Sequence, residues 1–276
     1  EFRRVLFRSD VDCAGVIDLA ALERTLAGVA ARGERVGCVS VMAVNNEVGS
    51  ITPMRDVARI VRAASPSTVL HTDAVQAACW LDVRDIVRVT DVATFSAHKF
   101  GGPKGMGVMV VKSGTTLEPL IMGGGQERDR RSGTSNVAGI VSTAAALRAT
   151  SSDREHEVRR VGALKSRLVS AVRDRVADVM ETVAPERSVP GVAHLCIADV
   201  ESEALLFLLD QDGVCASAAS ACASGAMEPS HVLRAMGVEP RYAKGALRLS
   251  LGHTTTSDDV DAAVESIVRS VSRLRR

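Results

Sequence analysis

One lysine of this 276-residue chain, Lys99, has neighbours that a simple surface lysine would not require. It lies in the stretch TFSAHKFGGPKGMGVMVV, directly after Ser96 and His98 and just before a pair of glycines. A lysine amine can bind a phosphate or form an imine with an aldehyde. The serine and the histidine could hydrogen-bond a phosphate, and the glycines would let the backbone pass close to a bulky ligand. The alternative is a solvent-facing loop lysine.

A carboxylate has a comparable position earlier in the chain. Asp73 ends the apolar run TVLHTDA, which predicts a buried strand. The carboxylate could cap a helix or a turn, or it could balance a buried cation such as a protonated pyridine nitrogen. A lysine and an aspartate that each follow their own strand are the pair that pyridoxal phosphate requires. Lysine binds the aldehyde of that cofactor, and aspartate keeps the ring nitrogen protonated.

The elements around these residues predict an α/β fold. Four apolar runs have strand length, at residues 38–44, 68–74, 91–97 and 105–111. Between them, MRDVARIVRAA at 54–64 repeats apolar residues at helical spacing. Strands that alternate with helices favour a mostly parallel sheet, whose ligands bind at the carboxyl ends of the strands. Because Asn45–Glu47, Asp73 and His98–Lys99 each follow a strand, we expect them to meet at one edge of the sheet.

The second half of the chain predicts a smaller α/β domain. Residues 136–180 have a helical pattern, and the charged stretch 151–160 is the expected junction. VAHLCIA and ALRLSL predict strands, and the last helix should begin at Thr256, since Thr256-x-x-Asp259 is a capping signal. We therefore expect an uncertain leader (1–14), the remainder of a large cofactor-binding domain (15–153) and a small C-terminal domain (154–276).

Composition excludes several classes of function. The net charge is +1 and aromatic residues make up 3%, so we expect no direct nucleic-acid partner. No apolar run approaches the roughly 20 residues of a membrane-spanning helix, so we expect no membrane partner. The six cysteines form no CxxC pair, which argues against a metal site and for a reducing, cytoplasmic location.

One of the six thiols has the surroundings of a nucleophile. Cys222 lies in GVCASAASACASGAMEPS, a run of small residues that cannot pack a core and that predicts an exposed loop. Cys215 is the rival, but it follows LLDQDGV and is expected to start a short strand as a buried structural thiol. Cys79 and Cys196 are expected to be small core residues.

Six stretches, in their order along the chain, resemble the cysteine desulfurases of the NifS/IscS-like group. They are VNNEVGSITPM, HTDAVQAACW, FSAHKFGGPKGMGVM, GGGQERDRRSGTSNVAGIV, SAASACASGAMEPSHVLRAMG and LRLSLGHTTTSDDVD. The resemblance runs from about Gly15 to the C-terminus. It implies a fold-type I pyridoxal phosphate enzyme that acts as a homodimer. The family's N-terminal portion has no counterpart in residues 1–14, so we expect an N-terminally truncated large domain.

The resemblance also implies a role for each matching residue. Lys99 would bind the cofactor as a Schiff base, and Cys222 would be the nucleophile. The other cofactor contacts would be Asp73 at the ring nitrogen, Gln76 and Asn46 at the ring oxygen, Ser96 and His98 at the phosphate, and Thr134 at the phosphate of the partner subunit. Arg248, together with Asn46, would hold the substrate carboxylate, because a planar guanidinium can bind it in a bidentate way. The loop GGGQERDRRSGT could bind phosphate itself, but a dimer contact is favoured.

The implied reaction removes sulfur from L-cysteine, releases L-alanine and leaves a persulfide on Cys222. The sulfur acceptor would be an iron–sulfur scaffold protein or a tRNA-thiolating enzyme. One alternative is a selenocysteine lyase or another class V pyridoxal phosphate enzyme. An alternative of a different class is a non-catalytic sulfur-relay or scaffold protein.

Overall fold

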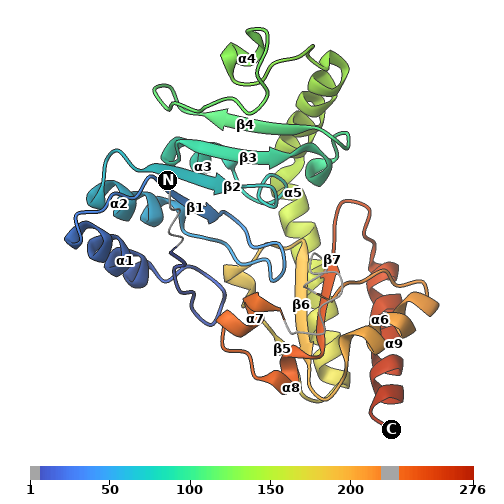
Figure 1. Ribbon diagram of the computed structural model, residues 1–276. Coiled ribbons are helices and arrows are strands. Elements are labelled where there is room, and N and C mark those ends of the chain that lie inside the picture. Colours follow the sequence, from blue (N-terminus) through green and yellow to red (C-terminus); the bar gives the residue numbers. More distant parts are fainter. Residues whose placement is uncertain (1–6, 219–229) are drawn as a thin grey trace. The chain divides into compact units, whose positions relative to one another are not determined.

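The computed structural model describes residues 7–218 and 230–276 (Figure 1). They form two compact units. The large-sheet unit comprises Val29–Ala43 and Pro53–Arg154. The small-sheet unit comprises Glu1–Gly28, Val44–Thr52 and Glu155–Arg276. The domain boundaries expected from the sequence remain a prediction.

The large-sheet unit contains a four-stranded sheet in the order β1-β2-β3-β4. The strands are β1 (Cys38–Met42), β2 (Val69–Asp73), β3 (Val92–Ser96) and β4 (Gly107–Val111). The first three are parallel and β4 is antiparallel to β3, which confirms the mostly parallel α/β sheet. β4 reverses because only the short 3₁₀ helix η1 (Ala97–Phe100) and a turn connect it to β3. A parallel connection would need a dozen or more residues.

Helices of the large-sheet unit follow the apolar pattern of the sequence. α2 (Met54–Ala64) has the predicted bounds and buries Val57, Ile60 and Val61. α3 (Val83–Val89) contacts both α2 and β3. The short segment α4 (Gln126–Asp129) follows β4. Apolar residues that recur every three or four positions therefore correctly indicate which face of α2 is buried.

The small-sheet unit contains an antiparallel sheet in the order β5-β6-β7. The strands are β5 (Val179–Glu181), β6 (Val192–Ile197) and β7 (Ala246–Ser250), and every residue of β6 is buried. The other elements are η2 (Pro185–Arg187), α6 (Ser202–Gln211), α7 (His231–Ala235), α8 (Pro240–Ala243) and α9 (Ser257–Leu274). α6 packs against α9. The predicted strands VAHLCIA and ALRLSL are thus the central strand β6 and the neighbouring strand β7.

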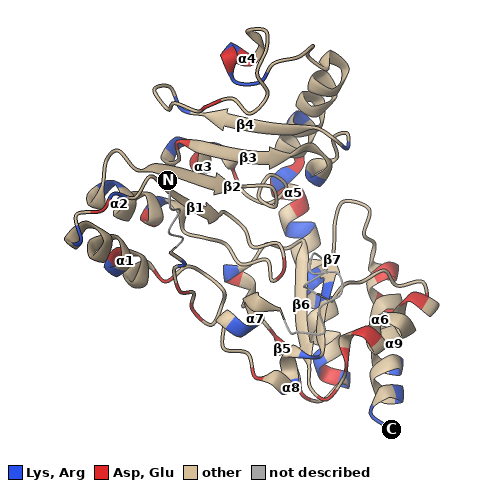
Figure 2. Ribbon diagram, viewed as in Figure 1, with Lys and Arg blue, Asp and Glu red and all other residues tan. Residues whose placement is uncertain are grey.

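α9 begins where its sequence predicts. Thr256 and Asp259 form the expected capping box, and the apolar face that includes Val260 and Ile267 is buried. Figure 2 shows acidic residues in the first half of α9 and basic residues in the second. This distribution complements the helix macrodipole.

Two helices belong partly to each unit, namely α1 (Leu19–Ala31) and α5 (Val137–Arg175). The charged stretch 151–160, where the sequence predicted a junction, contains the division between the two units after Arg154, and the 39-residue helix α5 continues through it. Within the described ranges, no helix has both the length and the apolar character needed to cross a membrane.

Candidate active site

Asp73 and Ser96 end neighbouring parallel strands of the large sheet. Asp73 is the last residue of β2 and pairs with Thr94, two residues before the end of β3 at Ser96. The carboxyl ends of these strands therefore present a carboxylate and a hydroxyl at the same edge. This is the edge at which α/β sheets bind ligands.

The turn after β3 directs the side chain of Lys99 outward. Ala97 and Phe100 are buried, whereas His98 and Lys99 are exposed. The backbone of the turn is fixed, because the Lys99 carbonyl accepts from Cys79 Sγ at 3.2 Å and the Phe100 carbonyl accepts from the Thr150 hydroxyl at 3.0 Å. No described residue forms a hydrogen bond or ion pair with the Lys99 amine. A fixed backbone thus presents an amine that a ligand can reach.

The two residues that the sequence predicts as phosphate ligands meet each other. Ser96 Oγ lies 2.8 Å from His98 Nδ1. Ser96 is half-buried at the end of β3, and His98 is exposed on η1. Both side chains therefore lie at one point beside Lys99, where a phosphate oxygen could replace their mutual contact.

The two glycines after the lysine turn are explained by the turn itself. Gly101 has a φ of +83° and ends η1. A Cβ on Gly102 would lie 2.9 Å from the Cβ of Ala97, closer than real Cβ contacts. The chain therefore needs glycine here to reverse towards β4, and space for a ligand is not required to account for either residue.

Asp73 acts as a turn residue and still has an available oxygen. Its Oδ1 accepts from the backbone N–H of Val75 at 2.9 Å. Its Oδ2 accepts from none of the described residues. Gln76 is half-buried in the same turn. The turn-capping interpretation of Asp73 is thus observed, and it leaves one carboxylate oxygen for a cationic ring nitrogen.

In the small-sheet unit, the structure brings together the two predicted substrate residues. Arg248 on β7 donates from Nη1 to the backbone carbonyl of Asn46 at 3.0 Å. Asn46 follows Asn45, whose Oδ1 accepts from the backbone N–H groups of Glu47 and Val48 at 2.8 and 3.0 Å. Asn45 therefore builds the turn, while the half-buried Asn46 is free to present its amide.

Sequence reasoning missed a buried contact next to Asn46. Glu47 is 6% exposed, and its Oε2 accepts from the Ser230 hydroxyl at 2.5 Å. Ser230 also caps α7 by accepting from the N–H groups of Val232 and Leu233. A glutamate in the run NNE, a few residues after β1, is the sequence feature that could have signalled this contact.

The cysteines differ in exposure, and one expectation is wrong. Cys222 lies outside the described residues. Cys215 was expected to be buried, but it is exposed. It precedes the isolated bridge between Ser217 and Arg248 and does not belong to a strand of the sheet. Burial therefore gives no reason to discount Cys215 as a rival nucleophile.

Two other thiols are unsuited to nucleophilic attack. Cys196 is fully buried as expected, and burial raises its pKa to about 11. Cys79 is only half-buried, which corrects its interpretation as a core residue, but burial still raises its pKa. Because the thiolate is the reactive form, both are poor nucleophiles near neutral pH.

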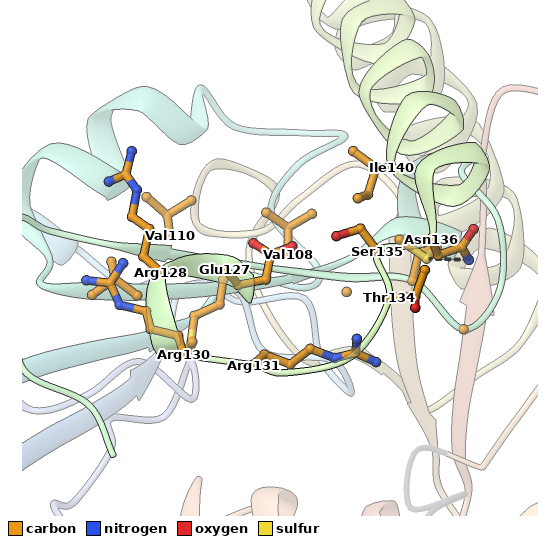
Figure 3. A pocket seen from close by; sticks show the side chains of 15 residues that line it. Val108, Val110, Glu127, Arg128, Arg130, Arg131, Thr134, Ser135, Asn136 and Ile140 are labelled. Carbon is orange, nitrogen blue, oxygen red and sulfur yellow. Dashed lines mark hydrogen bonds between the residues drawn. The ribbon is translucent and has the colours of Figure 1, made fainter. Parts of the chain in front are cut away.

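Thr134 lies in a different part of the large-sheet unit, at a cavity beside β4. The cavity has a volume of about 850 Å³. Figure 3 shows Val108 and Val110 lining it together with Glu127, Arg128, Arg130, Arg131 and Thr134. Three successive residues of this loop, Glu127 to Asp129, have positive φ angles. Such backbone conformations are costly for residues other than glycine and persist where surroundings impose them.

Comparison with known proteins identifies one family. The profile of the family "Aminotransferase class-V" matches residues 6–263. An IscS-like cysteine desulfurase of Mycobacterium tuberculosis is 42% identical over 87% of this chain and 61% of its own length. A cysteine desulfurase of Gluconacetobacter diazotrophicus is 37% identical over 96% of this chain and 64% of its own length.

A solved structure of a NifS-like protein has the same fold. It superposes with a TM-score of 0.84 at 35% identity, and the match covers 97% of this chain and 68% of the solved chain. The present chain spans less than two thirds of the length of the two curated relatives described above.

Proposed function

Since this chain belongs to the class-V aminotransferase family, we propose that it acts as a pyridoxal phosphate-dependent cysteine desulfurase. The reaction would convert L-cysteine into L-alanine and leave a persulfide on the protein. The observation that carries the proposal is the edge of the large sheet, where Asp73, Ser96, His98 and Lys99 follow two neighbouring strands. The similarity to relatives named cysteine desulfurase supports the choice of reaction.

The residues at that edge fit pyridoxal phosphate. Lys99 would hold its aldehyde, Asp73 Oδ2 its protonated ring nitrogen, and Ser96 and His98 its phosphate. Gln76 and Asn46 are proposed at its ring oxygen. When bound, the cofactor supplies an electron sink for the carbon skeleton of the substrate. The exposed Lys99 amine would accept and hold the proton from the substrate Cα.

Arg248, Asn46 and Cys222 are proposed to act on the substrate. Arg248 and Asn46 would hold the carboxylate of L-cysteine. The Cys222 thiolate would attack the substrate sulfur, so that a sulfur–sulfur bond forms and the carbon–sulfur bond breaks. The electron pair stays with the carbon, which takes up a proton and leaves as alanine. Cys222 is preferred to Cys215 because it lies in the matching motif; Cys215 is exposed, and Cys222 lies outside the described residues.

We propose that the protein acts as a homodimer and passes its sulfur to an acceptor protein. Exposed apolar residues lie before and after the loop 123–134, which contains Arg128, Arg130 and Arg131. They are Leu120 (98% exposed), Met122 (81%), Val137 (66%) and Val141 (62%). Apolar side chains at such exposure are typical of an interface. Thr134, on the same loop, would then reach the cofactor phosphate of the partner subunit. An iron–sulfur scaffold protein and a tRNA-thiolating enzyme both remain candidates for the acceptor.

The decisive experiment uses the complete gene product with added pyridoxal phosphate. We expect a yellow protein that forms alanine and sulfide from L-cysteine in the presence of a thiol reductant. Selenide from L-selenocysteine is measured in parallel, and a strong preference for that substrate would favour a selenocysteine lyase. A protein that stays colourless with added cofactor would favour the non-catalytic sulfur-relay function.

A further inference from the structure

His194 is a buried polar residue in the middle of an otherwise apolar strand, VAHLCI. It is 2% exposed. Its Nε2 atom is buried and has no hydrogen-bond partner in the described part of the chain, and the same is true of Nε of Arg248. Because a buried polar atom without a partner is costly, two such atoms on paired residues require an explanation.

The two side chains lie on the same face of the small sheet. His194 on β6 is directly opposite Arg248 on β7. The backbone N–H and C=O of Arg248 bind Ser217, at 2.8 and 3.1 Å, on the other side of β7. His194 and Arg248 therefore form a non-hydrogen-bonded pair, the type in which side chains approach most closely.

Thr182 and Arg248 together indicate which nitrogen of His194 carries the proton, because the Thr182 hydroxyl alone could either donate to Nδ1 or accept from it. Thr182 Oγ1 lies 2.6 Å from Nδ1 of His194 and 3.2 Å from its backbone carbonyl. If Nδ1–H donates to Thr182 Oγ1, the threonine hydroxyl can donate to the carbonyl, and both groups are satisfied. That tautomer leaves a lone pair on Nε2. The other tautomer would point an N–H group at the cationic guanidinium of Arg248.

We propose that His194 is a positioning residue for Arg248, with its Nε2 lone pair accepting the Nε–H of the guanidinium. Asn46 accepts from Nη1 on the other side. The guanidinium is then held at two points, and its remaining N–H groups are available for a carboxylate. This inference rests on the proposed function, in which Arg248 binds the carboxylate of L-cysteine.

Two substitutions of similar size separate positioning from core packing. His194→Asn places its amide near Thr182 but is too short to reach Arg248, whereas the longer His194→Gln can offer Oε1 near the position of Nε2. We expect the asparagine variant to raise KM for L-cysteine about 10-fold, with a smaller change in kcat, because a hydrogen bond to a charged group is lost. We expect the glutamine variant to restore KM to within about threefold of the original value.

A matched control is His71→Asn on β2. His71 is also a sheet histidine with two side-chain contacts, to Ser40 at 2.8 Å and Thr94 at 3.2 Å. This variant should leave KM unchanged. An unchanged KM in His194→Asn, or an equal rise in both His194 variants, would overturn the positioning role.

A second measurement does not depend on activity or on the cofactor. In protein labelled with ¹⁵N-histidine, long-range ¹H–¹⁵N spectra report the tautomer of His194, and we expect a protonated Nδ1 and an unprotonated Nε2. A protonated Nε2 would overturn the inference, even if His194→Asn fails to fold. Absence of any reaction with L-cysteine would instead overturn the proposed function, and the spectrum would still test the contact with Arg248.

Discussion

The two clusters of candidate site residues are built in opposite ways. In the large-sheet unit, the side chains of His98 and Lys99 are exposed, and buried neighbours fix only their backbone. In the small-sheet unit, Arg248 is half-buried in the middle of a strand and lies opposite the fully buried His194. The difference indicates a division of tasks. A side chain that must exchange partners during a reaction needs freedom, and one that orients a substrate needs fixed neighbours.

The largest expected effect tests the exposed cluster. Lys99→Ala should lower the rate of sulfide release from L-cysteine by roughly 10²–10⁴-fold, because the group proposed to move the Cα proton is removed. The yellow colour of the cofactor–lysine imine should disappear as well. Lys104→Ala is the control, because Lys104 is exposed on the neighbouring turn and should be dispensable. Comparable activity in Lys99→Ala and the original protein would show that this cluster does not perform the chemistry.

The second prediction concerns the two candidate nucleophiles, Cys222 and Cys215. Cys222→Ala should keep the yellow colour and lose nearly all sulfide release and persulfide formation, since the nucleophile is gone. Cys215→Ala should keep both. The measurement is alkylation of the persulfide followed by mass spectrometry of the labelled peptide. If the labelled peptide of the original protein contains Cys215 instead of Cys222, the assignment of the nucleophile is wrong.

The third prediction tests the fixed cluster. Arg248→Lys retains the charge but loses Nε and the planar group that Asn46 and the substrate would share. We expect kcat/KM for L-cysteine to fall about 10- to 100-fold, mostly through KM, because charge-assisted hydrogen bonds are lost. Absorption of the bound cofactor should not change. A loss of colour together with activity would mean that Arg248 acts on the cofactor and not on the substrate.

The same contrast explains what the sequence could predict. The bounds of α2 follow from local spacing and the start of α9 follows from its capping box, and both match the sequence-based predictions. The polar residues after β2 and β3 could also be predicted, because a strand end is a local feature. The pairing of His194 with Arg248 across β6 and β7 depends on the register of strands more than 50 residues apart in sequence, which no local pattern encodes.

One incorrect expectation shows what a local pattern does not encode. Cys215 was expected to be buried because it follows LLDQDGV and was predicted to start a short strand, but its exposure depends on which segments pack nearby. The stretch 151–160 was interpreted as a junction because it is charged, and the division between the two compact units falls within it, after Arg154. The continuity of α5 through this stretch could not be predicted in the same way, because charge is equally typical of a linker and of the solvent-facing turns of a long helix.

The smallest expected effect concerns the pH dependence of stability, which should differ between the buried His194 and the exposed His98. Burial, with a further contribution from Arg248, lowers the pKa of His194 from 6.5 to about 3. Between these values the unfolded chain binds a proton that the folded chain does not. The free energy of unfolding should therefore decrease as the pH falls from about 6.5 towards 3, by at most about 1.4 kcal/mol per pH unit from this residue.

His194→Gln should flatten this part of the pH profile, because glutamine does not titrate. Urea unfolding followed by circular dichroism between pH 4 and 7 measures the slope, and His98→Gln provides the comparison at an exposed position. An unchanged slope in His194→Gln would mean that the His194 site admits a proton when folded. Its Nε2 would then be an N–H donor facing the arginine, and the fixed cluster would not be organised around a neutral acceptor.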